Sequence, residues 1–296
     1  MENLDATIPN LITHTINVLF SNLFSSIDNS LYSILDDLVF VSTDIIDHPH
    51  LGDIIGNNIS GIILVANSLV IAFLIYYSIT YLLSHFTFSQ VQNPYQFIFR
   101  LLLCVIFINF SYSICYALIF STSTLSLAIR SIGENLFDTE IGFSSIIQNV
   151  NTVIFLEHNA FNIFSIDGLL KGFISIGLLN LLLSYALRYV IILVFILISP
   201  FAFLSLILTD SSWIFKSWLK IFLFLLMLQV FVSLILLVCF SISATSSDMF
   251  SRLIYIGSIY ALMKANNYLR DFMIGLGTDI SMGVNSIKSM FAGGHI

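Results

Sequence analysis

The sequence predicts an all-α, polytopic helical membrane protein with about five transmembrane helices, six being the alternative, and a long N-terminal amphipathic helix. Hydrophobic residues make up 58% of the 296 residues and charged residues only 9%, whereas a soluble domain carries roughly 25% charged residues. The mean hydropathy is +0.99. Several windows contain about 20 or more uncharged residues, which is long enough for a helix to cross the hydrocarbon core of a bilayer.

Residues 4–42 have the pattern of one amphipathic helix, because apolar residues recur at steps of three and four. A helix of this length cannot bury its apolar stripe alone, so it lies on a membrane, packs on the rest of the protein or packs on a copy of itself. Residues 1–58 hold eight acidic residues and no Lys or Arg, which favours packing over binding to anionic lipid. The missing basic residues also argue against a cleavable signal peptide.

The first predicted domain, residues 1–58, is this extracytoplasmic helix and a loop. The loop contains Asp47-His48-Pro49-His50. These side chains could coordinate a metal ion, but a solvated turn is the simpler interpretation. No metal and no other cofactor is therefore predicted. Residues 59–121 form the first transmembrane pair, with spans at 59–83 and 97–121, and Asn109 in the second span is expected to make an interhelical hydrogen bond.

Residues 122–168 are mixed and mostly polar, and they predict an extracytoplasmic central region of short amphipathic helices. The three cysteines, Cys104, Cys115 and Cys239, all lie in apolar runs. They are expected to be small core residues. Cys104 and Cys115 would be about 16 Å apart along one helix, too far for a disulfide.

The stretch 169–208 decides the topology of the predicted core, residues 169–270. Lys171 and Arg188 carry its only charges, and as a helix it would reach roughly 60 Å, twice the thickness of the hydrocarbon core. No Gly, Pro, Asn or Asp stands next to Arg188 to make a turn, so a continuous helix is favoured over a hairpin. Pro200 is expected to kink that helix, with neighbouring helices satisfying the freed carbonyl.

The remainder of the predicted core is a loop at 209–220 and two more spans, at 221–243 and 252–269. The loop carries two tryptophans and two lysines, a combination typical of an interfacial anchor; these are Trp213, Lys216, Trp218 and Lys220. Residues 271–296 form a small, polar cytoplasmic tail.

The positive-inside rule orients the predicted spans with the N-terminus outside and the C-terminus in the cytoplasm. Lys216 and Lys220 then belong inside, which requires a single crossing between 169 and 208. Arg188 would lie near the outer interface, and the apolar half 169–187 would need cover from protein. The stripe of residues 4–42 is expected to supply it, within or between subunits.

No phosphate-binding loop or zinc motif occurs, and no enzymatic activity or catalytic residue is predicted. An intramembrane charge is a functional candidate by default, so Arg188 stands as a structural or pore candidate beside the alternative of an arginine at the interface or paired with a backbone carbonyl. The other structural or pore candidates are Pro200, Trp213, Lys216, Trp218 and Lys220.

One part of the chain, Arg188 to Leu237, resembles a known family. Arg188-Tyr189-Val190, then Ile198-Ser199-Pro200-Phe201-Ala202, then Trp213, Lys216-Ser217-Trp218 and Gln229 are similar to the core of TrbL-like polytopic membrane subunits of type IV secretion and conjugation systems. The resemblance covers about a third of the chain. The shortage of Lys and Arg in the loops departs from what direct contact with DNA would require.

The resemblance implies a channel subunit of a bacterial plasma (inner) membrane. It would be a homo-oligomeric ring in contact with lipid and other secretion-system subunits, and it would pass DNA or protein cargo. The alternatives are a small-molecule transporter or exporter permease, and a membrane scaffold that conducts nothing.

Overall fold

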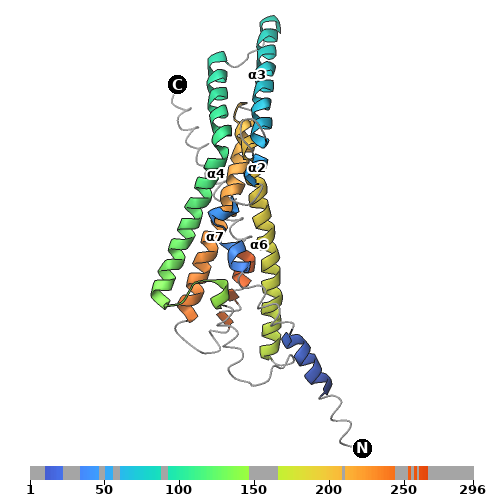
Figure 1. Cartoon of the computed structure of the whole chain (residues 1–296), viewed down its shortest axis with the longest axis vertical. Coiled ribbons are helices and arrows are strands. Elements are labelled where there is room, and N and C mark those ends of the chain that lie inside the picture. The colour runs from blue at the N-terminus through green and yellow to red at the C-terminus, as the bar shows by residue number, and fades with distance from the viewer. Residues whose placement is uncertain are drawn as a thin grey trace, which may run out of the picture. The chain divides into compact units, whose positions relative to one another are not determined.

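The computed structural model describes residues 11–22, 34–46, 51–55, 61–87, 93–146, 166–208, 211–243, 253–254, 257–258 and 260–265 (Figure 1). Every regular element among these residues is helical. The named elements are η1 (Thr43–Ile45), α2 (Leu51–Ile55), α3 (Ile62–Thr87), α4 (Pro94–Phe137), α6 (Ile166–Leu204) and α7 (Ser212–Ser243). The predicted all-α class is therefore confirmed.

Four of the described helices are long and apolar enough to cross a membrane. The candidate spans are Ile62–Phe86, Pro94–Phe137, Lys171–Leu204 and Ser212–Ser241. They define a membrane protein by length and composition. Only parts of the predicted span 252–269 belong to the described residues, where they are helical, so a total of five or six spans stays a prediction.

The N-terminal helix predicted over 4–42 is described in two helical pieces, 11–22 and 34–39. Residues 40–42 are not helical, because the Ser42 side chain accepts a hydrogen bond from the Asp44 backbone N–H and so caps η1. The predicted continuity from 4 to 39 depends on residues outside the described ones.

α4 is much longer than the predicted span 97–121. Asn93 accepts a hydrogen bond from the Tyr95 N–H and Pro94 occupies the first helical position, a favourable start. The helix then continues to Phe137, so the short separate helices expected from residue 122 are wrong for 122–137. The polar residues there suit a helix because their hydroxyls donate to carbonyls on the preceding turn, as Thr124 does to Phe120 at 2.8 Å.

α6 confirms the prediction of a continuous helix through Arg188, since it runs unbroken over 39 residues from Ile166 to Leu204. Pro200 lies inside it and has no N–H to donate to the carbonyl of Ile196. The Ser199 hydroxyl donates to that carbonyl at 2.7 Å. The freed carbonyl is thus satisfied by the same helix, not by a neighbouring helix as predicted.

α7 begins at Ser212, so the predicted loop 209–220 is wrong for residues 212–220. The apolar side chains of Phe215, Trp218 and Phe222 recur at helical steps and bind the first turns to α6, as described below. Local composition, with its tryptophans and lysines, concealed this periodicity.

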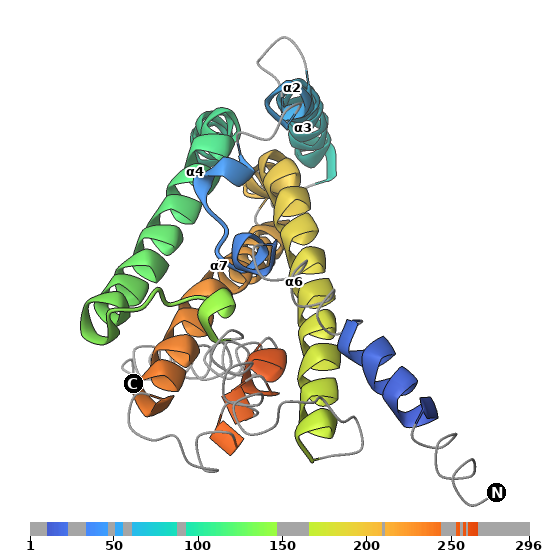
Figure 2. The same ribbon diagram turned by 60° about the horizontal axis from the view of Figure 1, so that its bottom comes forward.

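The chain divides into two compact units. The first comprises Met1–Phe40, Ser126–Ala186 and Leu228–Ile296, and the second Val41–Leu125 and Leu187–Met227. In the first unit, Leu35 and Val39 of the turn 34–39 are fully buried, and this turn lies beside the first half of α6 (Figure 2). Leu11 and Leu19 are 71% and 63% exposed, so among the described residues of the N-terminal stripe the expected cover is observed for the turn 34–39 and not for 11–22.

The second unit has its own apolar core, built around buried residues of α3, α4, α6 and α7 such as Ala66, Ile108, Ile196 and Phe222. Tyr77 of α3 stacks on Phe97 of α4 with ring centroids 3.7 Å apart. Asn67 donates a 3.4 Å hydrogen bond to Asn109 across the same pair. The predicted interhelical role of Asn109 is confirmed.

Candidate functional site in the α6–α7 pair

Arg188 lies on α6 in the second unit, and its side chain is only 4% exposed. Its Nε donates a 2.8 Å hydrogen bond to the backbone carbonyl of Leu225 on α7. A charged donor of this kind makes a stronger bond than a neutral one, and more so away from water. Of the alternatives for this residue, pairing with a backbone carbonyl is the one observed.

Trp218 anchors α7 to α6 from the inside of the second unit. Its side chain is 5% exposed, and its Nε1–H donates to the carbonyl of Phe195 at 3.1 Å. Its ring packs against Phe203 and Phe222 with centroids 5.7 and 5.3 Å away. The indole therefore fills the core of the second unit and bonds within it, and its role as an interfacial anchor stays a prediction.

We call this group the aromatic cluster: Phe195 and Phe203 of α6 with Phe215, Trp218 and Phe222 of α7. Aromatic rings at such offset and tilted distances attract one another beyond their burial alone. None of the four phenylalanines of the aromatic cluster was among the predicted site residues. The spacing of residues 215, 218 and 222, one apolar face of a helix, was the signal that could have found Phe215 and Phe222.

The side chains of the other three residues of the predicted anchor are exposed. Trp213 is 65% exposed, and Lys216 and Lys220 are exposed on the first turns of α7. An exposed indole beside exposed ammonium groups suits a membrane–water interface. The sequence motif therefore splits into one core residue and three surface residues.

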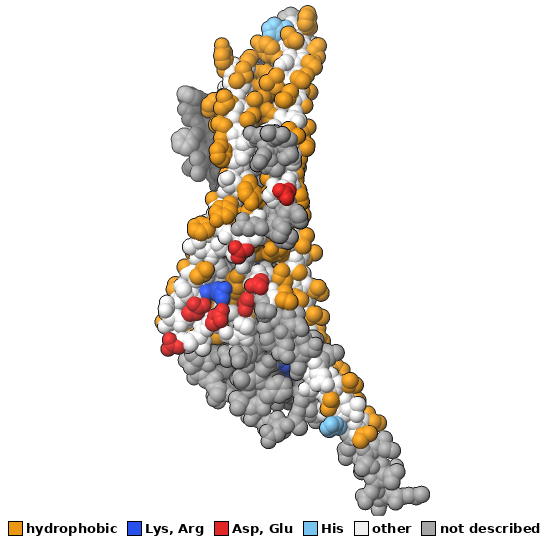
Figure 3. Space-filling view, in the orientation of Figure 1, with side chains coloured by type: hydrophobic (Ala, Val, Ile, Leu, Met, Phe, Trp, Pro, Cys, Tyr) orange, Lys and Arg blue, Asp and Glu red, His pale blue; other side chains and the backbone are white. Residues whose placement is uncertain are grey.

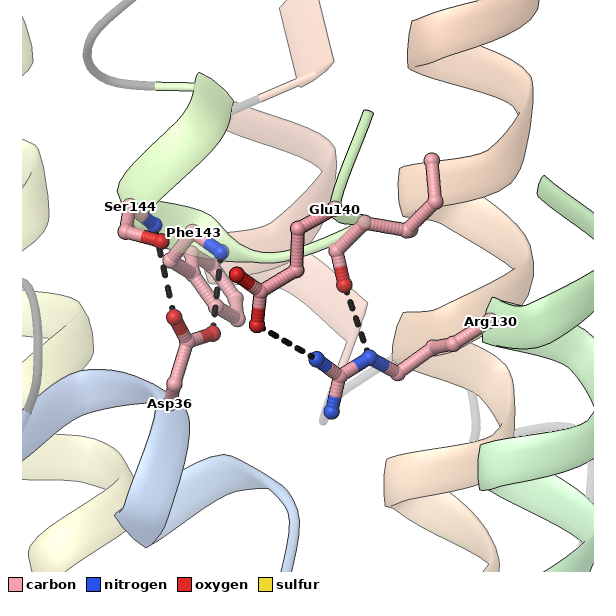
Figure 4. A network of polar contacts seen from close by, with 6 residues as sticks. Asp36, Arg130, Glu140, Phe143 and Ser144 are labelled. Atoms are coloured by element: carbon pink, nitrogen blue, oxygen red, sulfur yellow. Dashed lines mark hydrogen bonds and ion pairs between the residues drawn. The ribbon is translucent and has the colours of Figure 1, made fainter. Parts of the chain in front are cut away.

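A second polar site, which sequence analysis missed, lies in the first unit (Figure 4). Asp36 is half-buried, and its carboxylate accepts hydrogen bonds from the backbone N–H groups of Phe143 at 2.9 Å and Ser144 at 3.4 Å. The carboxylate thereby caps the short helical turn 143–146. A Cβ at Gly142 would approach the Asp36 carboxylate to 3.0 Å, so the fit depends on a glycine there.

Arg130 completes this site from α4. Its Nε donates to the carbonyl of Ile141 at 2.7 Å, and its Nη2 lies 3.8 Å from a carboxylate oxygen of Glu140. The guanidinium carbon lies 4.3 Å from the centre of the Phe40 ring. Residues 122–168 contain five acidic residues beside Arg130, and only the fold decides which of them Arg130 meets. The site fastens the turn 34–39 to the end of α4 and to the segment after it.

Burial raises the pKa of the Asp36 carboxyl above its ordinary value of 3.8, while the backbone N–H groups of Phe143 and Ser144 and the charge of Arg130 oppose that rise. A raised pKa means that the folded state binds the proton more tightly than the unfolded state does. The contribution of Asp36 to stability is therefore fully present below pH 3.8 and declines as the pH rises through the raised pKa.

We expect this decline to disappear in an Asp36→Asn variant. The measurement is the free energy of unfolding of the detergent-solubilised protein across the acidic range, taken as the difference between wild type and variant so that other carboxyls cancel. The matched control is Asp37→Asn, because Asp37 is the exposed neighbour. A wild-type-minus-Asp36→Asn difference that rises with pH over this window would contradict the prediction.

Buried hydroxyls also join α4 to α7 in the first unit. The Oγ atoms of Ser126 and Ser233 are 2.6 Å apart, and Ser233 donates to the carbonyl of Gln229 at 2.9 Å. The Gln229 carboxamide is fully buried, and it makes no hydrogen bond with the described residues. Interhelical hydrogen bonds of this kind hold membrane helices in register.

In the described part of the chain, no three His, Cys, Asp or Glu side chains gather closely enough to hold a metal. The segment Asp47–His50 lies outside the described residues. Cys104, Cys115 and Cys239 are free thiols, and all three are buried, as the sequence predicted for small core residues.

The fold and these sites define a class of protein, a helical membrane protein whose long helices are fastened by buried polar groups. Hydrophobic side chains gather on the drawn face over α3 and the first part of α4 (Figure 3). Comparison with protein-family models finds no match, and comparisons with curated proteins and with solved structures find no significant similarity.

Proposed function

We propose that the chain is a non-enzymatic channel subunit of a type IV secretion or conjugation apparatus in a bacterial plasma (inner) membrane. The observation that carries this proposal is the packing of the α6–α7 pair. Arg188 and Trp218, which stand in the stretch with the TrbL-like resemblance, each donate a hydrogen bond to a backbone carbonyl on the facing helix. This stretch therefore forms a packed core. A packed core of this kind can support the association of several subunits.

The exposed apolar surface supports an oligomer embedded in lipid. Only 17% of the candidate span in α3 and 44% of that in α7 is buried within the chain. Exposure of this apolar surface to water would cost a free energy of roughly 25 cal/mol per Å². Lipid and neighbouring subunits are the partners that would cover it, and the cargo would be DNA or protein.

The proposed orientation has the N-terminus outside and the C-terminus in the cytoplasm. We expect a membrane-impermeant maleimide to label Thr139→Cys in intact cells and Ser212→Cys only after permeabilisation. The native cysteines give little background because all three are buried. Labelling of Ser212→Cys from outside would mean that the single crossing by α6 and the orientation are wrong.

The function is tested in donor cells that carry the complete secretion system. We expect deletion of this gene to abolish transfer of DNA or secreted protein, and a second copy of the wild-type gene to restore it. The chain should also purify in mild detergent as a ring together with other secretion subunits.

Two outcomes would replace the proposal. Unchanged transfer with altered efflux of a small molecule would indicate a permease. A chain that is needed for assembly but gives no ion or cargo conductance in reconstituted bilayers would indicate a scaffold.

A further inference from the structure

A groove in the first unit lies between the second half of α7 and the described helical residues that follow it. Its volume is about 580 Å³, and its walls include Leu234 and Val238 of α7 and Leu253, Ile254 and Gly257 opposite them. All of these residues belong to one compact unit. The groove is therefore formed within that unit.

The walls of the groove present hydrocarbon. Cys239 and Ser258 are the lining residues with polar side-chain atoms, and the Ser258 side chain hydrogen-bonds the Cys239 thiol. Both side chains are buried, at 4% and 6% exposed. A ligand of this groove consequently needs to supply apolar atoms and no hydrogen bond.

Position and size indicate what kind of hydrocarbon fits. Leu234 and Val238 lie within the candidate span Ser212–Ser241, and lipid hydrocarbon is the solvent that surrounds a membrane-spanning helix. A cavity of about 150 Å³ accommodates benzene, and the volume of this groove is roughly four times as large. A Cβ added at Gly257 would meet nothing within 4 Å, which leaves an opening through which a chain can enter.

We propose that this groove binds one acyl chain of a membrane phospholipid. An empty groove would forfeit dispersion contacts along both walls, and a flexible alkyl chain restores them. An acyl chain supplies apolar atoms and no hydrogen-bonding group, which is what the walls of this groove require. The lipid would fasten α7 to the helical residues after it.

The test uses the full chain in nanodiscs that contain a phospholipid with a photoreactive diazirine on its acyl chain. After illumination, mass spectrometry locates the adducts. We expect Gly257→Leu, which fills the opening, to reduce adducts on residues 234–239 by roughly tenfold. Adducts on the lipid-facing surface of α3 should not change, and they serve as the internal reference for general lipid contact.

The matched control is Gly52→Leu, because a Cβ at Gly52 also meets nothing within 4 Å and the residue lies outside the groove. If Gly257→Leu fails to fold, Ala261→Leu narrows the groove from the same wall. Undiminished adducts in a folded groove variant would overturn the proposal. So would a high yield of disulfide-linked dimer from Leu253→Cys in membranes, which would show a second copy of the chain in the groove.

Discussion

Replacing Trp218 by alanine is expected to destabilise the protein by about 3–5 kcal/mol, the usual cost of deleting a large buried aromatic side chain. The indole is 5% exposed, it stacks on Phe222 with centroids 5.3 Å apart, and its N–H satisfies the carbonyl of Phe195. Its removal opens a cavity in the aromatic cluster and loses that hydrogen bond. The measurement is thermal unfolding of the detergent-solubilised protein, followed by circular dichroism.

The chain contains its own control for this prediction. Trp213 stands on the same helix five residues earlier, is 65% exposed, and is the only other tryptophan of the sequence. Trp213→Ala should change the free energy of unfolding by no more than about 0.5 kcal/mol. Trp218→Phe should fall between the two, since it keeps a ring and loses the donor. Equal effects of the two alanine variants would argue against the buried position of Trp218.

Replacing Arg188 by alanine is expected to cost about 3 kcal/mol, from the cavity left by the long side chain and the lost charge-assisted bond. Arg188 connects α6 to the Leu225 carbonyl at 2.8 Å. Arg188→Lys should recover only part of the loss, because a lysine offers a compact ammonium in place of the planar guanidinium. The same thermal unfolding measurement applies.

Arg100→Ala is the matched control, because Arg100 is half-buried near the beginning of α4 and is expected to reach the interface. Its loss should have a much smaller effect than that of Arg188. In the transfer assay, Arg188→Met separates stability from function, since it keeps most of the volume and removes the charge. A stable Arg188→Met protein that transfers normally would mean that the charge is needed neither for stability nor for transfer.

The length of the uncharged, apolar segments was the reliable signal in this sequence. It predicted the spans in α3 and α7 and the buried state of the cysteines, because a segment of uncharged residues that long has few alternatives to a helix in lipid. The continuity of α6 through Arg188 was predicted from the lack of turn-forming residues beside it. Polar composition misled at two places. Residues 122–137 and 212–220 contain Ser, Thr, Lys or Trp, yet both are helical because hydroxyls bond to the preceding turn and aromatic rings pack on α6.

The sequence by itself determined that this is an all-helical membrane protein, since its composition leaves too few polar residues for a soluble surface. The tertiary structure alone decided which polar groups meet. Asp36 is 107 residues away in the chain from Phe143, whose backbone N–H donates to its carboxylate, and Arg188 is 37 residues away from Leu225. No local pattern encodes such pairings, because they depend on which turns of two long helices face each other, and that is fixed only when the apolar faces pack.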